Sequence, residues 1–305
     1  MKEIEKECAF CGKSFITTSK IRQCCSTVCS HKLSALKTKQ MNKNFKRIYN
    51  INDNFLKNDI AEKYYFLGLM ASDGCLSPNT KTISICQSGE EGLKLLKYIN
   101  DILNSDYKIL STQPKIGKRV YGLYYRSEAL WKDLNDNNVV PKKTYIYTIP
   151  LYILNDTNKL KSFLIGYIDG DGSIGVYKNM LVISFVCSNA MCEQLKKLDL
   201  FKKALFYKKG KVVEIRFNGV KAVEFGNFLY KDYNLFKSYK YKKFFEYNSK
   251  MLDISPKMKY NLIQHKLFEA LNNNPNLNCM QYAKENNLHF QYVYYNRKKW
   301  KEQYE

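Results

Sequence analysis

The spacing of apolar residues divides the chain into regions with different predicted structure. Between residues 59 and 250, helical spacing alternates with short stretches in which every second residue is apolar, so we expect helices and strands to alternate there. Residues 251–305 keep only the helical spacing. Residues 36–58 are rich in Asn and Lys and predict a linker, whereas residues 1–35 hold five of the ten cysteines.

The central region contains one pattern twice. The nonamer FLGLMASDG at 66–74 recurs as LIGYIDGDG at 164–172, 98 positions later. In both copies an alternating strand, a helix, an extended basic stretch and an amphipathic helix follow, at 83–88, 90–103, 108–126 and 128–135, and at 183–188, 190–198, 202–217 and 221–230. We therefore predict a mixed α/β (α+β) fold of two pseudo-symmetric αββαββα repeats, residues 59–150 and 151–250.

Each nonamer predicts a helix that packs closely against its counterpart and ends in a carboxylate. Both nonamers carry two small residues four positions apart, which let two helix backbones approach closely. Packed side by side, the helices bring together Asp73 and Asp171, each followed by a glycine at the C′ position. A carboxylate there faces the negative end of the helix dipole, at a cost of up to about 1 kcal/mol. A bound Mg²⁺, which prefers oxygen ligands, would relieve that cost and the repulsion between the carboxylates.

The net charge indicates the kind of partner. Fifty Lys and Arg against 28 Asp and Glu give a formal charge of +22, which favours a polyanion, most often nucleic acid. Residues 201–260 alone hold 15 basic and 5 acidic residues. The residues expected to contact DNA are Lys81, Lys115, Lys118, Arg119, Arg126, Lys178, Lys208, Lys209, Lys211, Arg216, Arg297 and Lys298.

The two nonamers resemble the signature of the LAGLIDADG homing endonucleases. The second copy, GYIDGDG, is close to that signature, whereas the first, GLMASDG, has Ala71 where the family usually has an acid. The resemblance implies that Asp73 and Asp171 are the catalytic, Mg²⁺-binding acids. It also implies polar helpers, for which Gln87 and Lys221 are the candidates, and a saddle formed by the strands of both repeats over the major groove.

The N-terminal cysteines predict a structural zinc site. Cys8 and Cys11 form a CxxC pair followed by glycine, and Cys25 and Cys29 form a second pair, so four thiolates can close a tetrahedral site. The spacing resembles small zinc knuckles of the form CxxCGKxF…CSxxC. Cys24 competes with Cys25, and His31 with Cys29; a disulfide cluster or free thiols are the alternatives. The five other cysteines are expected to be small core residues.

The C-terminal segment predicts a helix-turn-helix-like DNA-binding module at 251–305. A helix is expected at 259–271. Ala283 is the small residue where two helices would cross, Asn287 tolerates a left-handed turn, and Leu288 and Val293 supply apolar contacts beneath. An ordinary helical hairpin is the alternative.

The predicted function is a site-specific double-strand DNA endonuclease in which metal-activated water attacks the scissile phosphates. Two copies in one chain predict a monomer and a target of low symmetry; the resemblance implies an intron-encoded or free-standing mobile element. An RNA intron maturase or a non-catalytic DNA-binding regulator on the same scaffold are alternatives, although both tolerate loss of the two acids that this chain retains. No signal sequence or membrane span is visible, so we expect an intracellular protein without a membrane partner.

Overall fold

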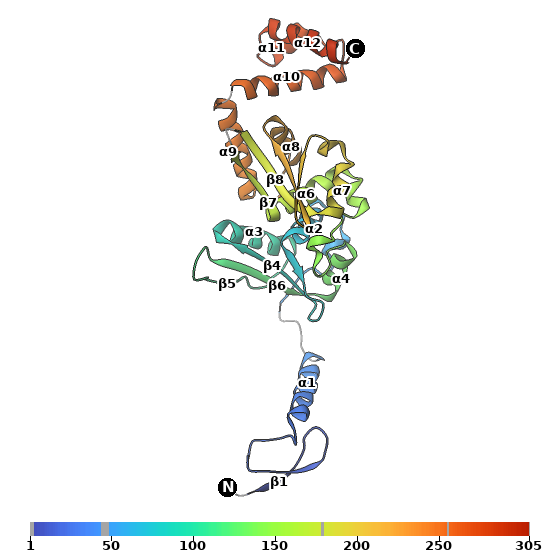
Figure 1. Cartoon of the computed structure of the whole chain (residues 1–305), viewed down its shortest axis with the longest axis vertical. Helices are drawn as coiled ribbons and strands as arrows, with labels where there is room; N and C mark the ends of the chain where they lie inside the picture. The colour runs from blue at the N-terminus through green and yellow to red at the C-terminus, as the bar shows by residue number, and fades with distance from the viewer. Residues whose placement is uncertain (1–2, 44–48, 178–179, 255, 305) are drawn as a thin grey trace. The chain divides into compact units, whose positions relative to one another are not determined.

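The computed structural model describes residues 3–43, 49–177, 180–254 and 256–304 (Figure 1). Contacts divide the chain into two compact units, Met1–Asn50 and Ile51–Glu305. Lys178, expected to contact DNA, lies outside the described residues. None of the described helices is long and apolar enough to cross a membrane.

The first unit is a hairpin followed by a helix. Strands β1 (Ile4–Glu7) and β2 (Ser14–Thr17) pair in antiparallel fashion, and helix α1 (Thr27–Lys43) follows. The segment predicted as a linker, 36–58, is therefore partly helical at its start. At its other end, the short 3₁₀ helix η1 (Phe55–Lys57) belongs to the second unit, where Phe55 is buried.

The αββαββα order is confirmed in both repeats. The first repeat consists of α2 (Ala61–Ser72), β3 (Gly74–Leu76), β4 (Thr82–Ser88), α3 (Gly89–Ile102), β5 (Leu110–Thr112), β6 (Val120–Arg126) and α4 (Glu128–Asp136). The second consists of α6 (Thr157–Asp171), β7 (Gly172–Tyr177), β8 (Met180–Ser188), α7 (Asn189–Lys196), β9 (Leu205–Lys209), β10 (Val212–Asn218) and α8 (Val220–Tyr230). Between them lie η2 (Lys143–Tyr145) and α5 (Leu151–Leu154), and η3 (Asp199–Phe201) follows α7.

The two sheets have the same topology. Their strand orders are β3-β4-β6-β5 and β7-β8-β10-β9, and every pairing is antiparallel. The first strand of each sheet starts directly after the aspartate that ends the preceding helix: Gly74 pairs with Ile85, and Gly172 with Phe185. The repeats are thus equivalent in register as well as in element order.

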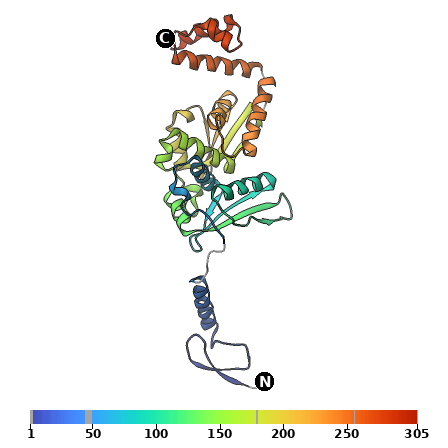
Figure 2. The same cartoon turned by 180° about the vertical axis from the view of Figure 1, so that it is seen from behind.

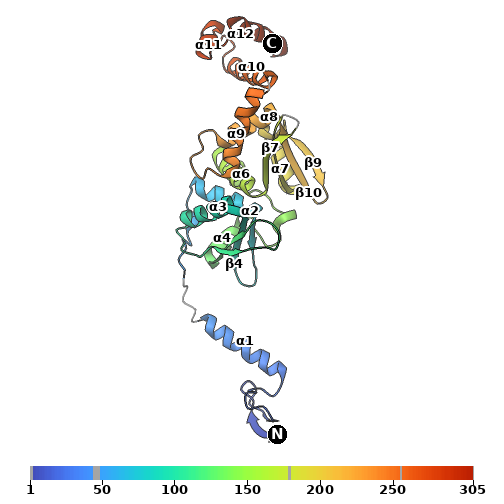
Figure 3. The ribbon, with the colours of Figure 1, turned by 90° about the vertical axis from the view of Figure 1, so that its left-hand side faces the viewer.

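Each sheet has one covered face and one open face. Ile83 and Ile85 of β4 are buried beneath α3, whereas Ser84 and Cys86 point to the opposite side. In the second sheet, α7 and α8 pack on β8 and β10 and leave the other face open (Figure 3). Cys75 and Cys86 are exposed on the open face of the first sheet, so the prediction that they are core residues is wrong.

Helices α2 and α6 pack against each other at the centre of the second unit (Figures 1 and 2). Both are buried over most of their length, because apolar residues cover nearly their whole circumference. A Cβ on Gly68 would lie 1.9 Å from the carbonyl oxygen of Phe163, and one on Gly166 would lie 2.0 Å from that of Tyr65. The contact is reciprocal, and only glycine fits at either position.

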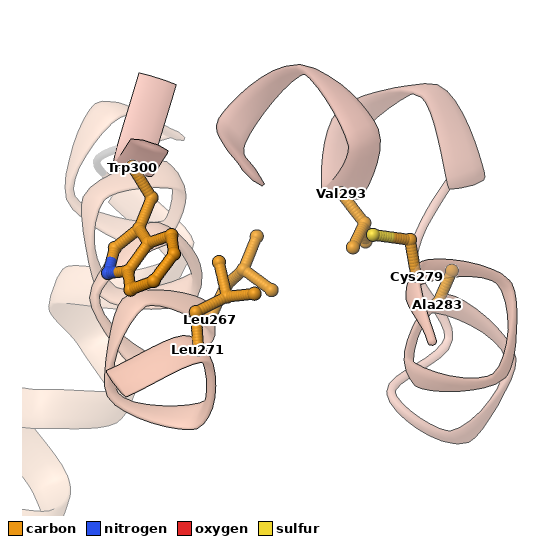
Figure 4. Packing of buried hydrophobic residues seen from close by; sticks show 6 residues of the cluster. All are labelled: Leu267, Leu271, Cys279, Ala283, Val293 and Trp300. Atoms are coloured by element: carbon orange, nitrogen blue, oxygen red, sulfur yellow. The ribbon is translucent and has the colours of Figure 1, made fainter. Parts of the chain in front are cut away.

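Four further helices follow the second repeat. Helix α9 (Tyr239–Ile254), which sequence analysis did not predict, packs on β7 and β8. Helices α10 (Pro256–Asn273), α11 (Cys279–Glu285) and α12 (Phe290–Tyr304) enclose a separate small core (Figure 4). That core consists of Leu267, Leu271, Cys279, Ala283, Val293 and Trp300. Asn287 has a φ of 52° in the turn between α11 and α12, as its position predicted.

Candidate functional site

The structure brings Asp73 and Asp171 together at the ends of α2 and α6. Asp171 is the last residue of α6, and Asp73 caps α2 by donating its backbone N–H to the Leu69 carbonyl at 3.0 Å. A Cβ on Gly170 would lie 3.1 Å from Cγ of Asp73, so the backbone at the end of α6 touches that carboxylate. Burial raises the pKa of both aspartates, and the charge of Asp73 raises that of Asp171 further.

The glycines that follow the two aspartates have a different role from the one predicted. The described left-handed residues do not include Gly74 or Gly172; Gly172 is extended, with φ −83° and ψ 163°. A Cβ on Gly74 would lie 2.6 Å from the Met70 carbonyl oxygen, and one on Gly172 would lie 2.5 Å from that of Ile168. These glycines therefore let the chain pass from each helix directly into a strand while its backbone stays close to the last turn of that helix.

Two lysines, the buried Lys143 and the partly buried Lys240, cap the helix ends. Lys143 donates to the carbonyls of Ser72, at 3.3 Å, and Gly74. Lys240 donates to three carbonyls at the end of α6, those of Ile168 (2.7 Å), Asp169 (2.9 Å) and Gly170 (2.8 Å). Burial lowers the pKa of both lysines, and the neighbouring carboxylates oppose that shift. Both place positive charge where the helix dipoles are negative.

Sequence analysis missed these lysines. They lie 97 positions apart, close to the 98 that separate Asp73 and Asp171, and each follows the last helix of its repeat. That spacing was the available signal. It was obscured because the surrounding residues differ, one lysine lying in η2 and the other at the start of α9.

Lys221, the predicted basic helper, lies elsewhere. It is exposed in the first turn of α8, where the N–H of Gly219 donates to Leu181 at the far end of β8. Leu181 is four residues from the Phe185 position that pairs with Gly172, or about 13 Å along the strand. The positive charges that act on the two aspartates are instead those of Lys143 and Lys240.

Gln87 lies beside the first carboxylate. Its Nε2 donates to Oδ2 of Asp73 at 2.5 Å, which favours the ionised form and partly offsets the effect of burial on the pKa. The equivalent position in the second repeat is Cys187, a buried residue whose thiol pKa is raised by burial. The two halves of the site are therefore unequal.

Asp169 is a structural neighbour of the site. It is buried, with its oxygens accepting hydrogen bonds from the hydroxyls of Tyr65 (2.8 Å) and Ser238 (2.6 Å). Burial raises its pKa to about 6. It connects α6 to α2 and to the segment before α9. Its counterpart Ala71 is buried as well, so the first repeat fills this position with an apolar side chain.

A cavity of about 710 Å³ lies near the end of α6, although its lining does not include Asp73 or Asp171. Gln87, Asp169 and Lys240 contribute to its wall, together with Lys118 and Arg119 from the segment before β6. Glu90 and Glu91 of α3 also line this cavity, so its wall carries charges of both signs.

The predicted DNA-contacting residues lie mostly around the open faces rather than on them. Lys115, Lys118 and Arg119 are exposed between β5 and β6, and Lys211 is exposed in the β9–β10 turn. By strand register, Arg126, Lys209 and Arg216 point to the open faces, whereas Lys208 points to the other side. Lys81, in the β3–β4 turn, places its ammonium group 3.8 Å from the Trp131 ring centroid.

The two predicted contacts in the C-terminal module differ. Arg297 donates to the carbonyls of Leu277 (3.0 Å) and Pro275 (2.8 Å), so its guanidinium holds the loop before α11 rather than extending to a phosphate. Lys298 is exposed on α12.

The N-terminal cysteines form a cluster suited to zinc. The sulfur atoms of Cys8, Cys11, Cys25 and Cys29 all lie within 4.8 Å of one another; Cys24 is not in this set. The Sγ distances from Cys25 to Cys11 and to Cys29 are both 3.6 Å, close to the edge of about 3.8 Å of a tetrahedron with 2.3 Å Zn–S bonds. Backbone N–H groups of Cys11 and Cys25 lower the pKa of Cys8 to about 5, which favours the thiolate that binds metal.

We predict about one zinc per chain. Elemental analysis of protein purified without chelator should find it, and Cys8→Ser or Cys29→Ser should lose it, because three thiolates close the tetrahedron less well. Cys24→Ser is the matched control and should keep its zinc. Wild-type protein without zinc, or equal loss in the Cys24→Ser control, would contradict the assignment.

No protein-family model and no curated protein sequence matches the chain. Among solved structures, a LAGLIDADG meganuclease, I-AabMI, bound to uncleaved DNA is similar, with 16% identity and a TM-score of 0.44, over 65% of this chain and 92% of that chain. The LAGLIDADG homing endonuclease I-GzeII in complex with its DNA target has 14% identity and a TM-score of 0.43, over 66% and 95%. I-SmaMI bound to uncleaved DNA in the presence of calcium ions has 12% identity and a TM-score of 0.42, over 65% and 95%. Because these identities and TM-scores are low, the function of this chain has to be inferred from its own residues.

Proposed function

We propose that this protein is a Mg²⁺-dependent endonuclease that cleaves both strands of a DNA duplex. Asp73 and Asp171 are its catalytic carboxylates. One observation carries the proposal: two equivalent aspartates, 98 positions apart in a repeat, meet at the ends of two helices whose glycines allow backbone contact. Burial disfavours the ionised form of both carboxyl groups, and the charge of Asp73 disfavours that of Asp171 further, so the pKa of each is raised. Such a site is costly unless a cation binds to it.

The donor set fits Mg²⁺, which takes oxygen ligands and usually few from the protein. Asp73 and Asp171 would hold the ion, which when bound would lower the pKa of a water ligand and neutralise charge on a phosphate. Gln87 fixes one oxygen of Asp73 through its hydrogen bond. Lys143 and Lys240 hold the two helix ends and present positive charge to the phosphate that enters between them.

The surrounding charge supports DNA as the substrate. The protein carries a formal charge of +22, and exposed lysines and arginines border the open faces of both sheets. Because both halves of the site come from one chain with unequal side chains, we propose a monomer that acts on a target of low symmetry.

The proposal is tested by selection of cleaved sites. A library of random duplexes is incubated with the protein and Mg²⁺, and the cut ends are sequenced. We expect one asymmetric sequence to be enriched, with breaks in both strands a few base pairs apart. Cut products that are equally abundant with EDTA, or a set of cuts without any preferred sequence, would contradict it.

We further propose that helices α10–α12 add affinity for DNA rather than chemistry. Their separate core and the exposed Lys298 on α12 suit a helix-turn-helix-like module that contacts phosphates. Deletion of residues 256–305 should weaken duplex binding and reduce its dependence on salt, because fewer phosphate contacts release fewer counterions. Mg²⁺-dependent cleavage should remain at high protein concentration. An unchanged affinity and salt slope, measured by fluorescence anisotropy, would exclude a DNA-binding role for the module.

A further inference from the structure

The open face of the second sheet carries one buried acid. By register, Glu214 of β10 lies opposite Val186 and Tyr207 on the side facing away from the core, yet it is only 5% exposed. Lys209 and Arg216 cover it: Oε2 lies 2.5 Å from the Lys209 ammonium, and Oε1 accepts from Nε and Nη2 of Arg216 at 3.0 and 2.6 Å. Burial raises the pKa of Glu214, but these two partners outweigh that effect and lower it, so Glu214 is ionised.

This arrangement fixes the orientation of Arg216. Its guanidinium carbon lies 5.2 Å from the centroid of the Tyr207 ring, so the group is held by an aromatic ring as well as by Glu214. A guanidinium has five N–H donors in one plane, and Glu214 takes two of them, on the edge formed by Nε and Nη2. The terminal edge formed by Nη1 and Nη2 keeps two parallel donors. The side chain of Arg216 is 35% exposed and can present that edge outward.

The open face adjoins the end of α6, because β7 begins directly after Asp171. Ser173, two residues after Asp171, points to this face, where it pairs with Ser184; Ser184 in turn pairs with Arg216. Arg216 is thus two strands, or about 10 Å, from Ser173. That distance corresponds to about three base-pair steps along a DNA strand. A duplex that is cut at Asp171 and lies on the open face would therefore reach Arg216.

We infer that Arg216, positioned by Glu214 and Tyr207, reads a guanine in the major groove of the half-site bound by the second repeat. A two-stranded ribbon such as β9–β10 fits that groove, where guanine presents O6 and N7 to a pair of parallel donors. The inference rests on the proposed function, which supplies the duplex. It goes beyond that function by assigning one base to one side chain.

The first repeat lacks the equivalent reader. By register, the positions that correspond to Glu214 and Arg216 are Gly122 and Tyr124, and Leu110 corresponds to Tyr207. The ring of Tyr124 covers Gly122, since a Cβ there would lie 2.8 Å from Tyr124 Cε2. The preferred guanine therefore has no counterpart at the mirror position in the other half-site.

The test is selection of bound duplexes from a random library in Ca²⁺, with base frequencies compared between variants. Wild type should prefer guanine at one position roughly three to five base pairs from the cut site, on one side only. Arg216→Lys keeps the charge but loses the paired donors, so the preference should fall about tenfold at that position and nowhere else. Glu214→Gln and Tyr207→Ala should reduce the preference at the same position. Arg126→Lys, on the open face of the first sheet, is the matched control and should leave that position unchanged.

The outcomes separate the two proposals. If wild type selects no sequence, the proposed function fails, and this inference fails with it. If wild type selects a site but Arg216→Lys weakens binding equally at all positions, Arg216 contacts phosphate or serves stability, and only the inference fails. Tyr207 is exposed, so Tyr207→Ala can be tested even if Arg216→Lys does not fold. If the guanine preference is unchanged without the Tyr207 ring, the inference is wrong.

Discussion

Gly166→Ala is expected to destabilise the second unit by about 3 kcal/mol or more. The new methyl group would meet the Tyr65 carbonyl oxygen at 2.0 Å and the Leu69 nitrogen at 3.0 Å, and both are backbone atoms of a buried helix that no rotamer change can move. The higher helix propensity of alanine, about 1 kcal/mol relative to glycine, is too small to offset that overlap. Gly68→Ala should behave alike, because its Cβ would meet the Phe163 carbonyl.

Gly175→Ala is the matched control for this prediction. Gly175 lies in β7, and a Cβ there would have no atom within 4 Å. The free energy of unfolding of the Gly175→Ala variant should stay within about 0.5 kcal/mol of that of wild type. Urea unfolding followed by circular dichroism measures all three variants. If Gly166→Ala and Gly175→Ala unfold at the same urea concentration as wild type, α2 and α6 do not pack as described.

Much of the fold was predictable because its signals are local or repeated. The spacing typical of strands and helices recurs in the same order in both repeats. Two repeats would rarely give the same wrong order of predicted elements by chance. In the C-terminal segment, Asn287 indicated the turn because it tolerates a left-handed conformation, and Ala283 indicated the helix crossing because it is small. Helix α9 was missed because nothing in the repeat corresponds to it, and its contacts with β7 and β8 are tertiary.

The sequence predicted that the two aspartates come together, but it did not predict the two lysines beside them. Asp73 and Asp171 lie in the repeated nonamers. Lys143 and Lys240 instead donate to carbonyl groups about 70 positions away, from elements that differ between the repeats, η2 and α9. Lys221 was chosen by proximity to a helix in sequence, and the strand register places that helix end far from the carboxylates. Arg297 was predicted from a basic run at the end of the expected recognition helix. Such a run cannot distinguish a guanidinium that holds a loop from one that binds phosphate.

Asp73→Asn and Asp171→Asn are each expected to reduce double-strand cleavage by at least about 100-fold, the effect typical of removing one strong electrostatic contribution at an active site. The amide keeps the shape of the carboxylate but loses the charge that binds Mg²⁺. Neither substitution should lower stability. Burial raises the pKa of both aspartates in the folded protein, so their ionised forms oppose folding at neutral pH, and a neutral side chain removes that effect. Duplex binding in Ca²⁺ should remain, because affinity comes from the basic surface.

Asp169→Asn is the neighbouring control. Its side chain faces Tyr65 and Ser238 rather than the two aspartates at the helix ends, and the first repeat has Ala71 in its place. We expect a smaller loss of cleavage per folded molecule than for Asp171→Asn. Any loss of cleavage should be explained by lower stability of the variant, because the hydrogen bonds from Tyr65 and Ser238 to Asp169 stabilise the fold.

The most direct measurement follows a supercoiled plasmid that carries the selected target through its nicked and linear forms in Mg²⁺. Wild type and Asp169→Asn should linearise it. Asp73→Asn and Asp171→Asn should leave it supercoiled, or at most slowly nicked, while still binding the target in Ca²⁺. If both variants linearise the plasmid at the wild-type rate, the paired carboxylates at the ends of α2 and α6 are not the catalytic site.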